Sequence, residues 1–292
     1  MRKILFTLFA AFLLGPALAA GAPPRPAITG IAHIRFTVAS LDASRQFYGK
    51  LLGLSECPAA EGLCYRVNDH QAIELVAGKD PGPGAIVDVA FQTANVKQMR
   101  AFLTAHGVQV SEIKKNSNGE KFIEMLDPEG NHIQFLQYTK PLGAATTADA
   151  ISLLMIHCGF IVRDRAAEDH FYADLLGFHL YWWGGRQDTV PDWVDMQVPE
   201  GADWLEYMLN VPAIPTPHLL GVVNHVSLGV QDGDAAEALL RAHGWDGAQK
   251  DTIGRDGKWQ LGLYDPDGTR IELMELKLRR PPCCSEFNGR SH

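Results

Sequence analysis

Two stretches of this sequence repeat each other: HIRFTVASLDASRQFYGKLLGL at residues 33–54 and HCGFIVRDRAAEDHFYADLLGF at residues 157–178. Nine of the 22 aligned positions are identical, at a constant shift of 124. Each stretch opens with alternating residue types, which is typical of a strand with one buried face, and continues into a helix that ends at glycine. A repeat at a fixed shift indicates a duplicated structural unit.

Two further pairs of segments repeat at slightly larger shifts. AFLTAHG at 101–107 matches ALLRAHG at 238–244, and DPEGNHIQF at 127–135 matches DPDGTRIEL at 265–273. The order of the segments is the same in both halves, so the chain should contain two homologous domains. The parts that we expect are a first domain at residues 29–140, a second domain at residues 151–277, and a tail with proline and cysteine at residues 278–292.

Each half also divides into two units of one strand, one helix and three strands. The second unit of the first half should open with a strand at 86–92 and include a strand at 108–113. In the second half it should open with a strand at 222–230. Four such units make an α+β chain with mixed sheets.

The N-terminus has the pattern of a secretory signal peptide. Arg2 and Lys3 precede an apolar run at residues 4–14, and Ala17-Leu18-Ala19 has the small residues that precede cleavage. We expect residues 1–19 to be removed and the protein to be exported, to the periplasm or beyond. The apolar run is too short for a transmembrane helix, so no stable membrane insertion is expected after cleavage.

Composition excludes several classes of protein and of partner. The chain has 292 residues, 46% of them hydrophobic, which is too apolar for a disordered polymer. The 26 Lys and Arg residues against 34 Asp and Glu residues give a net charge of −8, with no basic run. This balance argues against nucleic acid as a partner and leaves a small-molecule substrate.

The five cysteines do not make a disulfide scaffold. Cys57 and Cys64 flank a loop and could pair with each other. The adjacent Cys283 and Cys284 in the tail could bind a soft metal or form a bridge to a partner, and Cys158 stands alone.

In the second half, two histidines and two glutamates occupy matching positions of the two units. His157 and His225 lie at the beginnings of strands, on the faces opposite their apolar neighbours. Glu206 and Glu272 lie on the closing strands, within apolar runs where an unpaired carboxylate would be costly. Two imidazoles and two carboxylates suit a divalent cation, namely nickel, zinc, iron, manganese or cobalt. The alternative is that the histidines cap strands and the glutamates pair with surface bases.

These motifs resemble the vicinal oxygen chelate superfamily, which includes glyoxalase I, bleomycin-resistance proteins and extradiol dioxygenases. The resemblance rests on HCGFIVRDRAAEDHFYADLLGF, NHVSLGVQDGDAAEALLRAHGW and YDPDGTRIELMEL, with GIAHIRFTV, FYGKLLGL and DPEGNHIQF in the first half. It implies four βαβββ modules forming two tandem open β-barrels, each curling around a possible metal position. It also implies that the metal ligands are His157, Glu206, His225 and Glu272.

The first half departs from the family's ligand pattern. His33 and Glu74 match, but Asp88 stands where the third ligand would be and Gln134 where the closing glutamate would be. Because Asp is shorter than His and Gln is a weaker, neutral ligand, we expect this half to be a degenerate copy of the site.

The resemblance leaves three functions open. A glyoxalase-like lyase or isomerase would use Glu206 or Glu272 to move a proton beside a metal-stabilised enolate. An extradiol dioxygenase would need a histidine in the stretch GRDGKWQLGLYDPDG, which has none. A non-catalytic protein that binds a small molecule, as bleomycin-resistance proteins do, is the third possibility.

All six tryptophans lie in the second half. Residues 181–193, YWWGGRQDTVPDW, should form an insertion that covers the barrel mouth or lines a pocket. Two residues from Glu206, Trp204 should share the metal face of its strand. The residues that we expect in the substrate pocket are Trp183, Arg186, Trp193 and Trp204.

Overall fold

The structure is a computed structural model in which residues 23–292 are described, apart from residue 60 and residues 144–148. The predicted signal peptide at residues 1–19 lies outside the described residues. Among the described residues, no helix is both long enough and apolar enough to cross a membrane.

The first half of the chain folds into two successive βαβββ modules. The first module consists of β1 (Ile28–Val38), α1 (Leu41–Ser44) with its π-helical continuation η1 (Arg45–Leu51), β2 (Ser55–Cys57), β3 (Leu63–Arg66) and β4 (Ala72–Ala77). The second module consists of β5 (Ile86–Thr93), α2 (Val96–Ala105), β6 (Lys114–Lys115), β7 (Lys121–Leu126) and β8 (His132–Gln137).

The second half repeats this order. Its first module consists of β9 (Met155–Ile161), α3 (Arg165–Asp169) with η2 (His170–Leu175), β10 (His179–Gly184), β11 (Trp193–Gln197) and β12 (Trp204–Met208). Its second module consists of α4 (Pro217–Val223), β13 (His225–Val230), α5 (Gly233–Ala242), β14 (Thr252–Ile253), β15 (Lys258–Tyr264) and β16 (Arg270–Leu278).

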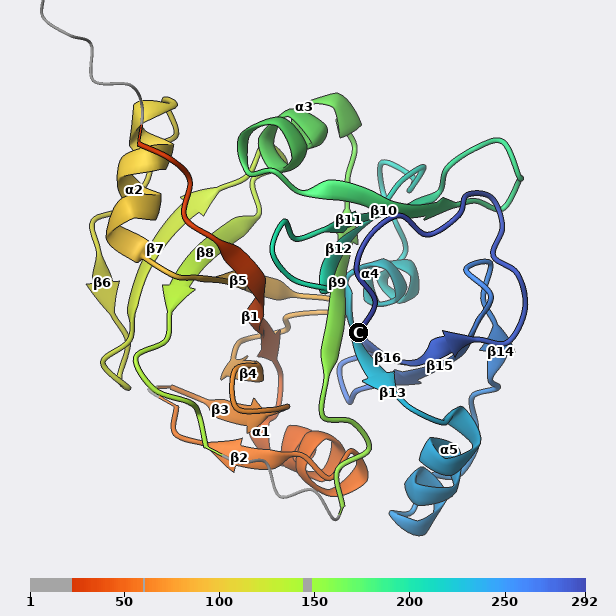
Figure 1. The fold of residues 1–292 in the computed structure, drawn as a ribbon. Coiled ribbons are helices and arrows are strands. Elements are labelled where there is room, and N and C mark those ends of the chain that lie inside the picture. The colour runs from red at the N-terminus through yellow and green to blue at the C-terminus, as the bar shows by residue number, and fades with distance from the viewer. Residues whose placement is uncertain (1–22, 60, 144–148) are drawn as a thin grey trace, which may run out of the picture.

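Each half forms one eight-stranded mixed sheet, in the orders β2-β3-β4-β1-β5-β8-β7-β6 and β10-β11-β12-β9-β13-β16-β15-β14. In both sheets the opening strands of the two modules pair antiparallel at the centre, and each pairs in parallel with its own closing strand. Figure 1 shows the two curled sheets side by side, with α2 and α5 at opposite outer edges. The predicted fold of four βαβββ modules in two open barrels is confirmed.

Two of the predicted strands differ from the structure. The strand expected at 222–230 begins only at His225, because residues before it form helix α4, with the Thr216 hydroxyl capping the N–H of Leu219 and Pro217 at the first turn. The strand expected at 108–113 is absent; only β6 pairs in that region. A short hydrophobic run can form either a helix or a strand, and its capping residues and neighbouring strands decide which of the two forms.

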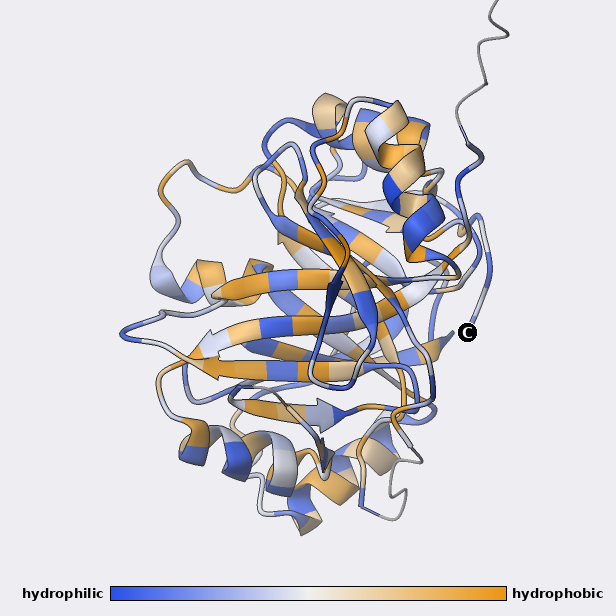
Figure 2. Ribbon diagram, turned by 90° about the vertical axis from the view of Figure 1, so that its left-hand side faces the viewer, coloured by the Kyte–Doolittle hydropathy of each residue, from blue (hydrophilic) through white to orange (hydrophobic). Residues whose placement is uncertain are grey.

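The two halves share one hydrophobic core. Hydrophobic and hydrophilic residues alternate along the strands, as Figure 2 shows, so each sheet has an apolar face and a more polar face. The core includes side chains from both halves, and Phe91 of the first half contacts Phe178 of the second with ring centroids 5.3 Å apart. The apolar faces therefore meet between the sheets, which leaves the polar concave faces for the candidate sites.

Repeated motifs of the two halves bind each other reciprocally. The hydroxyl of Tyr48 donates to Asp265 Oδ2 at 2.9 Å, and the hydroxyl of Tyr172 donates to Asp127 Oδ2 at 3.2 Å. Each aspartate belongs to an Asp-Pro-x-Gly turn of one half, and the tyrosine that donates to it lies on the π-helical segment of the opposite half. The repeated Phe-Tyr and Asp-Pro-x-Gly motifs thus join the two halves.

The cysteines are placed as follows. Cys57 and Cys64 form the disulfide that their spacing allowed, between β2 and β3, while Cys158 is buried and free. Cys283 and Cys284 are bonded to each other. The tail that contains them packs against the second barrel: the N–H of Asn288 donates to the carbonyl of Tyr181 at 2.8 Å.

Candidate metal centre

Each of the four central strands of the second sheet contributes one predicted ligand. They are His157 on β9, Glu206 on β12, His225 on β13 and Glu272 on β16. The two Nε2 atoms lie 3.1 Å apart. His157 Nε2 lies 3.3 Å from Glu272 Oε2, and His225 Nε2 lies 3.3 Å from Glu206 Oε2. The structure therefore brings all four predicted ligands together.

The local backbone directs these side chains. His225 is fully buried, and its Nδ1 lies 3.1 Å from the carbonyl of Val223, which fixes Nδ1 as the protonated nitrogen and presents the lone pair of Nε2 to the site. Gly159 makes room for that ring, because a Cβ at this position would lie 2.1 Å from His225 Cε1.

The donor set fits a divalent ion. Four donors about 2.1 Å from a central ion would lie about 3.4 Å apart in a tetrahedron or about 3.0 Å apart at neighbouring octahedral positions. The four His–Glu distances are 3.3 and 3.8 Å, each occurring twice, and donor atoms of His157, Glu206 and His225 all lie within 4.8 Å of one another. His157, Glu206 and His225 are therefore grouped closely enough to hold one ion, while Glu272 Oε2 lies outside that group, at 3.3 Å from His157 Nε2.

The electrostatics also favour a cation at this position. Burial, and then the charge of Arg270, lowers the pKa of His225, so its imidazole is neutral. Although burial acts to raise it, the pKa of Glu272 is lowered by Arg270 and by the two imidazoles. Two carboxylates thus face the neutral ring of His225 and the ring of His157, and a divalent ion would neutralise the charge of the two carboxylates.

Arg270 was not among the predicted site residues. Its Nη2 donates to His225 Nε2 at 2.7 Å, and its Nη1 donates to Glu272 Oε1 at 3.3 Å. An ion bound by His225 would displace the first of these bonds and leave the second. Strand alternation could have identified Arg270 as a site residue, since it lies two positions before Glu272 and therefore on the same face of the strand.

In the first half, an arginine takes the place that a metal ion would have. Arg35 Nη2 lies 2.6 Å from Glu74 Oε2 and Arg35 Nη1 lies 3.2 Å from Asp88 Oδ2. His33 Nε2 donates to Asp88 Oδ1 at 3.0 Å, and Gln134 is buried nearby. Although burial acts to lower it, the pKa of His33 is raised by Glu74 and Asp88. Arg35 and His33 thus both face the carboxylates of Glu74 and Asp88.

The strand register explains why the first half has an ion pair where the second half has the candidate metal centre. Arg35 lies opposite Glu74 and Asp88, as Gly159 lies opposite Glu206 and His225. A glycine leaves space for an imidazole in the second half, and the shorter aspartate leaves space for a guanidinium in the first.

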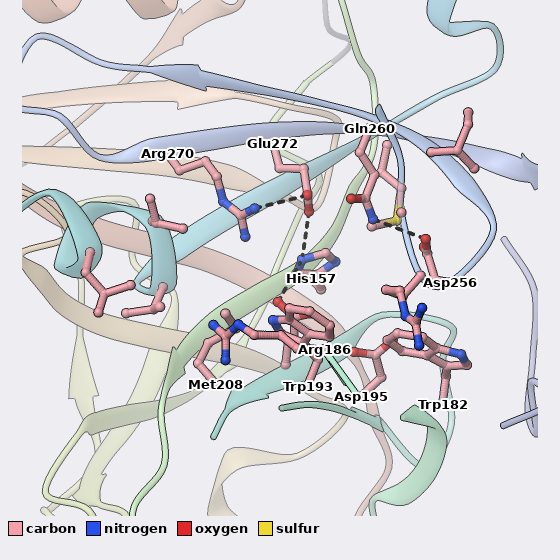
Figure 3. A pocket seen from close by; sticks show the side chains of 18 residues that line it. His157, Trp182, Arg186, Trp193, Asp195, Met208, Asp256, Gln260, Arg270 and Glu272 are labelled. Carbon is pink, nitrogen blue, oxygen red and sulfur yellow. Dashed lines mark hydrogen bonds and ion pairs between the residues drawn. The ribbon is translucent and has the colours of Figure 1, made fainter. Parts of the chain in front are cut away.

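A cavity of about 300 Å³ opens beside the second-half ligands (Figure 3). Arg186 and Trp193 line it as predicted, but its wall contains Trp182 where we expected Trp183. Trp204 is buried behind the wall, with its ring centroid 5.1 Å from that of His157. Part of the expected insertion is regular structure, since β10 runs to Gly184 and β11 begins at Trp193.

A β-bulge causes the change from Trp183 to Trp182. The register of β10 against β11 shifts between Leu180 and Trp182, so Tyr181 and Trp182 pack in the same aromatic cluster, while Trp183 packs against the main core. A bulge turns one side chain to the opposite face from the one that strict alternation predicts.

The chain belongs to the glyoxalase/bleomycin resistance protein/dioxygenase superfamily, whose family pattern matches residues 30–135 and 154–273. No curated protein sequence matches it. Its fold is similar to that of homoprotocatechuate 2,3-dioxygenase from Arthrobacter globiformis, with 21% identity over 86% of this chain and 81% of that chain and a TM-score of 0.67. It is also similar to the 2,3-dioxygenase LapB from Pseudomonas sp. KL28, with 16% identity over 86% and 93% of the two chains and a TM-score of 0.68.

Proposed function

We propose that the second half holds one divalent ion of nickel, zinc, iron, manganese or cobalt and acts as a glyoxalase-like lyase or isomerase on a small molecule with two adjacent oxygens. The observation that carries this proposal is the convergence of His157, Glu206, His225 and Glu272, with His–Glu donor distances of 3.3 and 3.8 Å. A second carboxylate in the donor set supports proton transfer, because one glutamate can act as a base while the other donors remain in place.

Of the two glutamates, Glu206 is the better candidate for the base. A bound ion would act as a Lewis acid that polarises the substrate oxygens and stabilises negative charge on them. Glu272 is held by Arg270, and its side chain is 5% exposed. Glu206 lines the cavity, is 13% exposed, and its ion-pair contacts within the described residues are to the two imidazoles. Glu206 is therefore free to turn toward a substrate proton.

The proposal is tested by measuring metal content and turnover together. The purified protein should hold about one divalent ion per chain, and Glu272→Gln should lose it. Glu206→Gln should keep much of the ion and lose about 10²- to 10⁴-fold in turnover of a 2-oxoaldehyde or related substrate, as expected for loss of a general base. Glu74→Gln, at the matching position of the first half, is the control and should change neither quantity. A wild-type protein without metal would overturn the proposal in favour of a non-catalytic binding protein.

The second candidate is a ring-cleaving extradiol dioxygenase. It is favoured by the solved structures with similar folds, one of which is homoprotocatechuate 2,3-dioxygenase from Brevibacterium fuscum with 3,4-dihydroxyphenylacetate bound, at 19% identity over 86% of this chain and 82% of that chain and a TM-score of 0.67. Oxygen uptake by the iron(II)-loaded protein with a panel of catechols separates this reaction from isomerisation, which consumes no oxygen.

We also propose that the protein is exported. The signal-peptide pattern at residues 1–19 supports this, as does the Cys57–Cys64 disulfide, because such bonds persist in oxidising compartments. Cell fractionation and N-terminal sequencing of the mature protein test it; an uncleaved chain that stays in the cytoplasm would contradict it.

A further inference from the structure

A second group of potential metal ligands lies in the second half, apart from the candidate metal centre. Asp188 belongs to the loop between β10 and β11, and Cys283 and Cys284 belong to the tail. Their ligand atoms all lie within 4.8 Å of one another. The carboxylate is exposed and the two cysteines are half-buried, so an ion can reach the group from solvent.

The three side chains converge on one positively charged atom. Arg255 Nη2 donates to Asp188 Oδ1. The same nitrogen lies 2.9 Å from Cys283 Sγ and 3.6 Å from Cys284 Sγ. A cationic nitrogen thus occupies the point at which an ion would meet all three donors. Arg255 also lines the cavity, so its side chain has space to move into when an ion takes that point.

The backbone holds the donors in place. The N–H of Cys283 donates to the carbonyl of Arg255 at 2.8 Å. Ser285 Oγ, just beyond the cysteines, accepts from the N–H of Trp183 at 2.9 Å and so ties the tail to β10. Asp188 lies in a tight turn between two bridged residues of its loop. Figure 1 shows the tail, in dark blue, running beside β10 and this loop.

The two cysteines are bonded to each other, so they can bind an ion only after reduction. A dithiol reductant would pass two electrons and two protons to the S–S bond, which gives two thiols, and would itself become a disulfide. Coordination then releases the two thiol protons, because the thiolate is the form that binds metal. A guanidinium beside a cysteine favours that form. In an oxidising compartment the bond keeps the site closed.

We propose that Cys283, Cys284 and Asp188 bind one thiophilic divalent ion, such as zinc, when the bond between the cysteines is reduced. Thiolate ligands prefer such ions over magnesium or calcium. In a tetrahedral zinc site, a thiolate sulfur and a carboxylate oxygen would lie about 3.6 Å apart. Cys283 Sγ lies 3.6 Å from Asp188 Oδ1. The two free sulfurs reach the necessary separation of about 3.8 Å by rotation of their side chains.

Cadmium tests the proposal, because its bonds to thiolates give an ultraviolet charge-transfer band that imidazole and carboxylate ligands do not give. The full chain is reduced, freed of reductant without oxygen, and titrated with cadmium against a competing chelator. The reduced wild type should show a band that is absent from the oxidised protein and from the double variant Cys283→Ser, Cys284→Ser. Asp188→Asn should bind cadmium about ten-fold or more weakly, because one charged donor is lost. Asp174→Asn, an exposed carboxylate elsewhere, should keep the wild-type affinity.

The other disulfide provides the matched control for the thiols. The double variant Cys57→Ser, Cys64→Ser removes it and should keep the band of the tail. If the reduced wild type shows no band that depends on Cys283 and Cys284, the proposal is overturned. Equal cadmium affinity of the wild type and Asp188→Asn would also overturn it, because two thiols alone would then explain the binding.

This proposal does not depend on the function proposed above, since the two sites share no ligand. Glu272→Gln removes a ligand of the candidate metal centre and should leave the cadmium–thiolate band unchanged. A wild type that shows the band but holds no ion in the candidate centre would overturn the proposed function alone. A wild type that holds that ion but shows no band from the tail would overturn the tail site alone.

Discussion

At position 35 and its counterpart 159, one residue separates an ion pair from a candidate metal centre. The guanidinium of Arg35 contacts Glu74 and Asp88, the two carboxylates that a cation would otherwise neutralise. Gly159 has no side chain, and the space is filled by the His225 ring. The sequence showed that Asp88 and Gln134 were poor ligands. It did not show that Arg35 contacts both Glu74 and Asp88, because that depends on cross-strand register.

Restoring the ligand pattern in the first half should create a second metal site. The triple variant Arg35→Gly, Asp88→His and Gln134→Glu removes the guanidinium and supplies the missing imidazole and carboxylate. We expect about two divalent ions per chain by elemental analysis, against about one in the wild type. Arg35→Gly alone serves as the control and should stay at about one. An unchanged metal content in the triple variant would show that the strand register and the four donor residues do not suffice to bind an ion.

Arg270 should oppose metal binding and assist the reaction. Its guanidinium donates to His225 Nε2, the atom that would coordinate the proposed ion, and it lines the cavity. Arg270→Met should therefore bind zinc several-fold more tightly in a competition titration. The same variant should lose about 10- to 100-fold in kcat/KM, because a charged hydrogen-bond donor beside the substrate is gone. A fall in both quantities would mean that Arg270 only supports the fold.

At the scale of the element, the sequence predicted most strands and missed the irregular ones. Alternation identified β9 and β16 with their ligands, and an apolar run that contains a single carboxylate identified β12. Residues 181–193 were expected to form an insertion, and Trp183 was expected to line the pocket. Trp182 lines the cavity instead, because of a bulge that is set by pairing with β11 and leaves no clear mark in the strand's own residues. The cavity wall formed by α4 was missed because no helix was predicted at Pro217–Val223, and the last two of its residues were assigned to the following strand.

The two π-helical segments should contribute to stability through their tyrosines. Tyr48→Phe and Tyr172→Phe each remove one hydroxyl that donates to an aspartate of the other half. Each variant should lower the free energy of unfolding by about 1–2 kcal/mol, measured by denaturant titration. The double variant should lose about the sum. Tyr138→Phe, whose hydroxyl contacts a carbonyl of its own half at 3.4 Å, is the control and should lose less.

At the scale of the whole molecule, the halves are joined through buried carboxyl groups as well as through the core. Asp203 accepts the N–H of Ile31 and the side-chain amide of Gln71, and Glu168 accepts the N–H of Glu129. Burial raises the pKa of Asp203 to about 7, and burial together with Asp127 raises that of Glu168 to about 8. Both groups are therefore neutral in the folded protein at mildly acidic pH.

This arrangement makes the junction of the halves weaken as pH rises. The folded pKa values lie above the unfolded ones, so the stability that these carboxyls contribute is complete below about pH 4 and is lost as pH rises through 7 and 8. The melting temperature of the wild type should fall more between pH 5 and pH 9 than that of the double variant Asp203→Asn, Glu168→Gln. Parallel curves for the two proteins would show that the two carboxyls do not titrate in this way.

Because of the Arg35 ion pair, we expect the protein to fold before it binds the proposed ion. The first half carries its own positive charge within the site, so it can fold in a metal-free solution. The second half shares a hydrophobic core with the first, so its packing does not depend on an ion alone. We therefore expect folding to precede metal binding, in contrast to small zinc domains that fold only with their metal. A chelator should therefore abolish turnover while the circular dichroism spectrum is retained, and a chain refolded without metal should accept the ion afterwards.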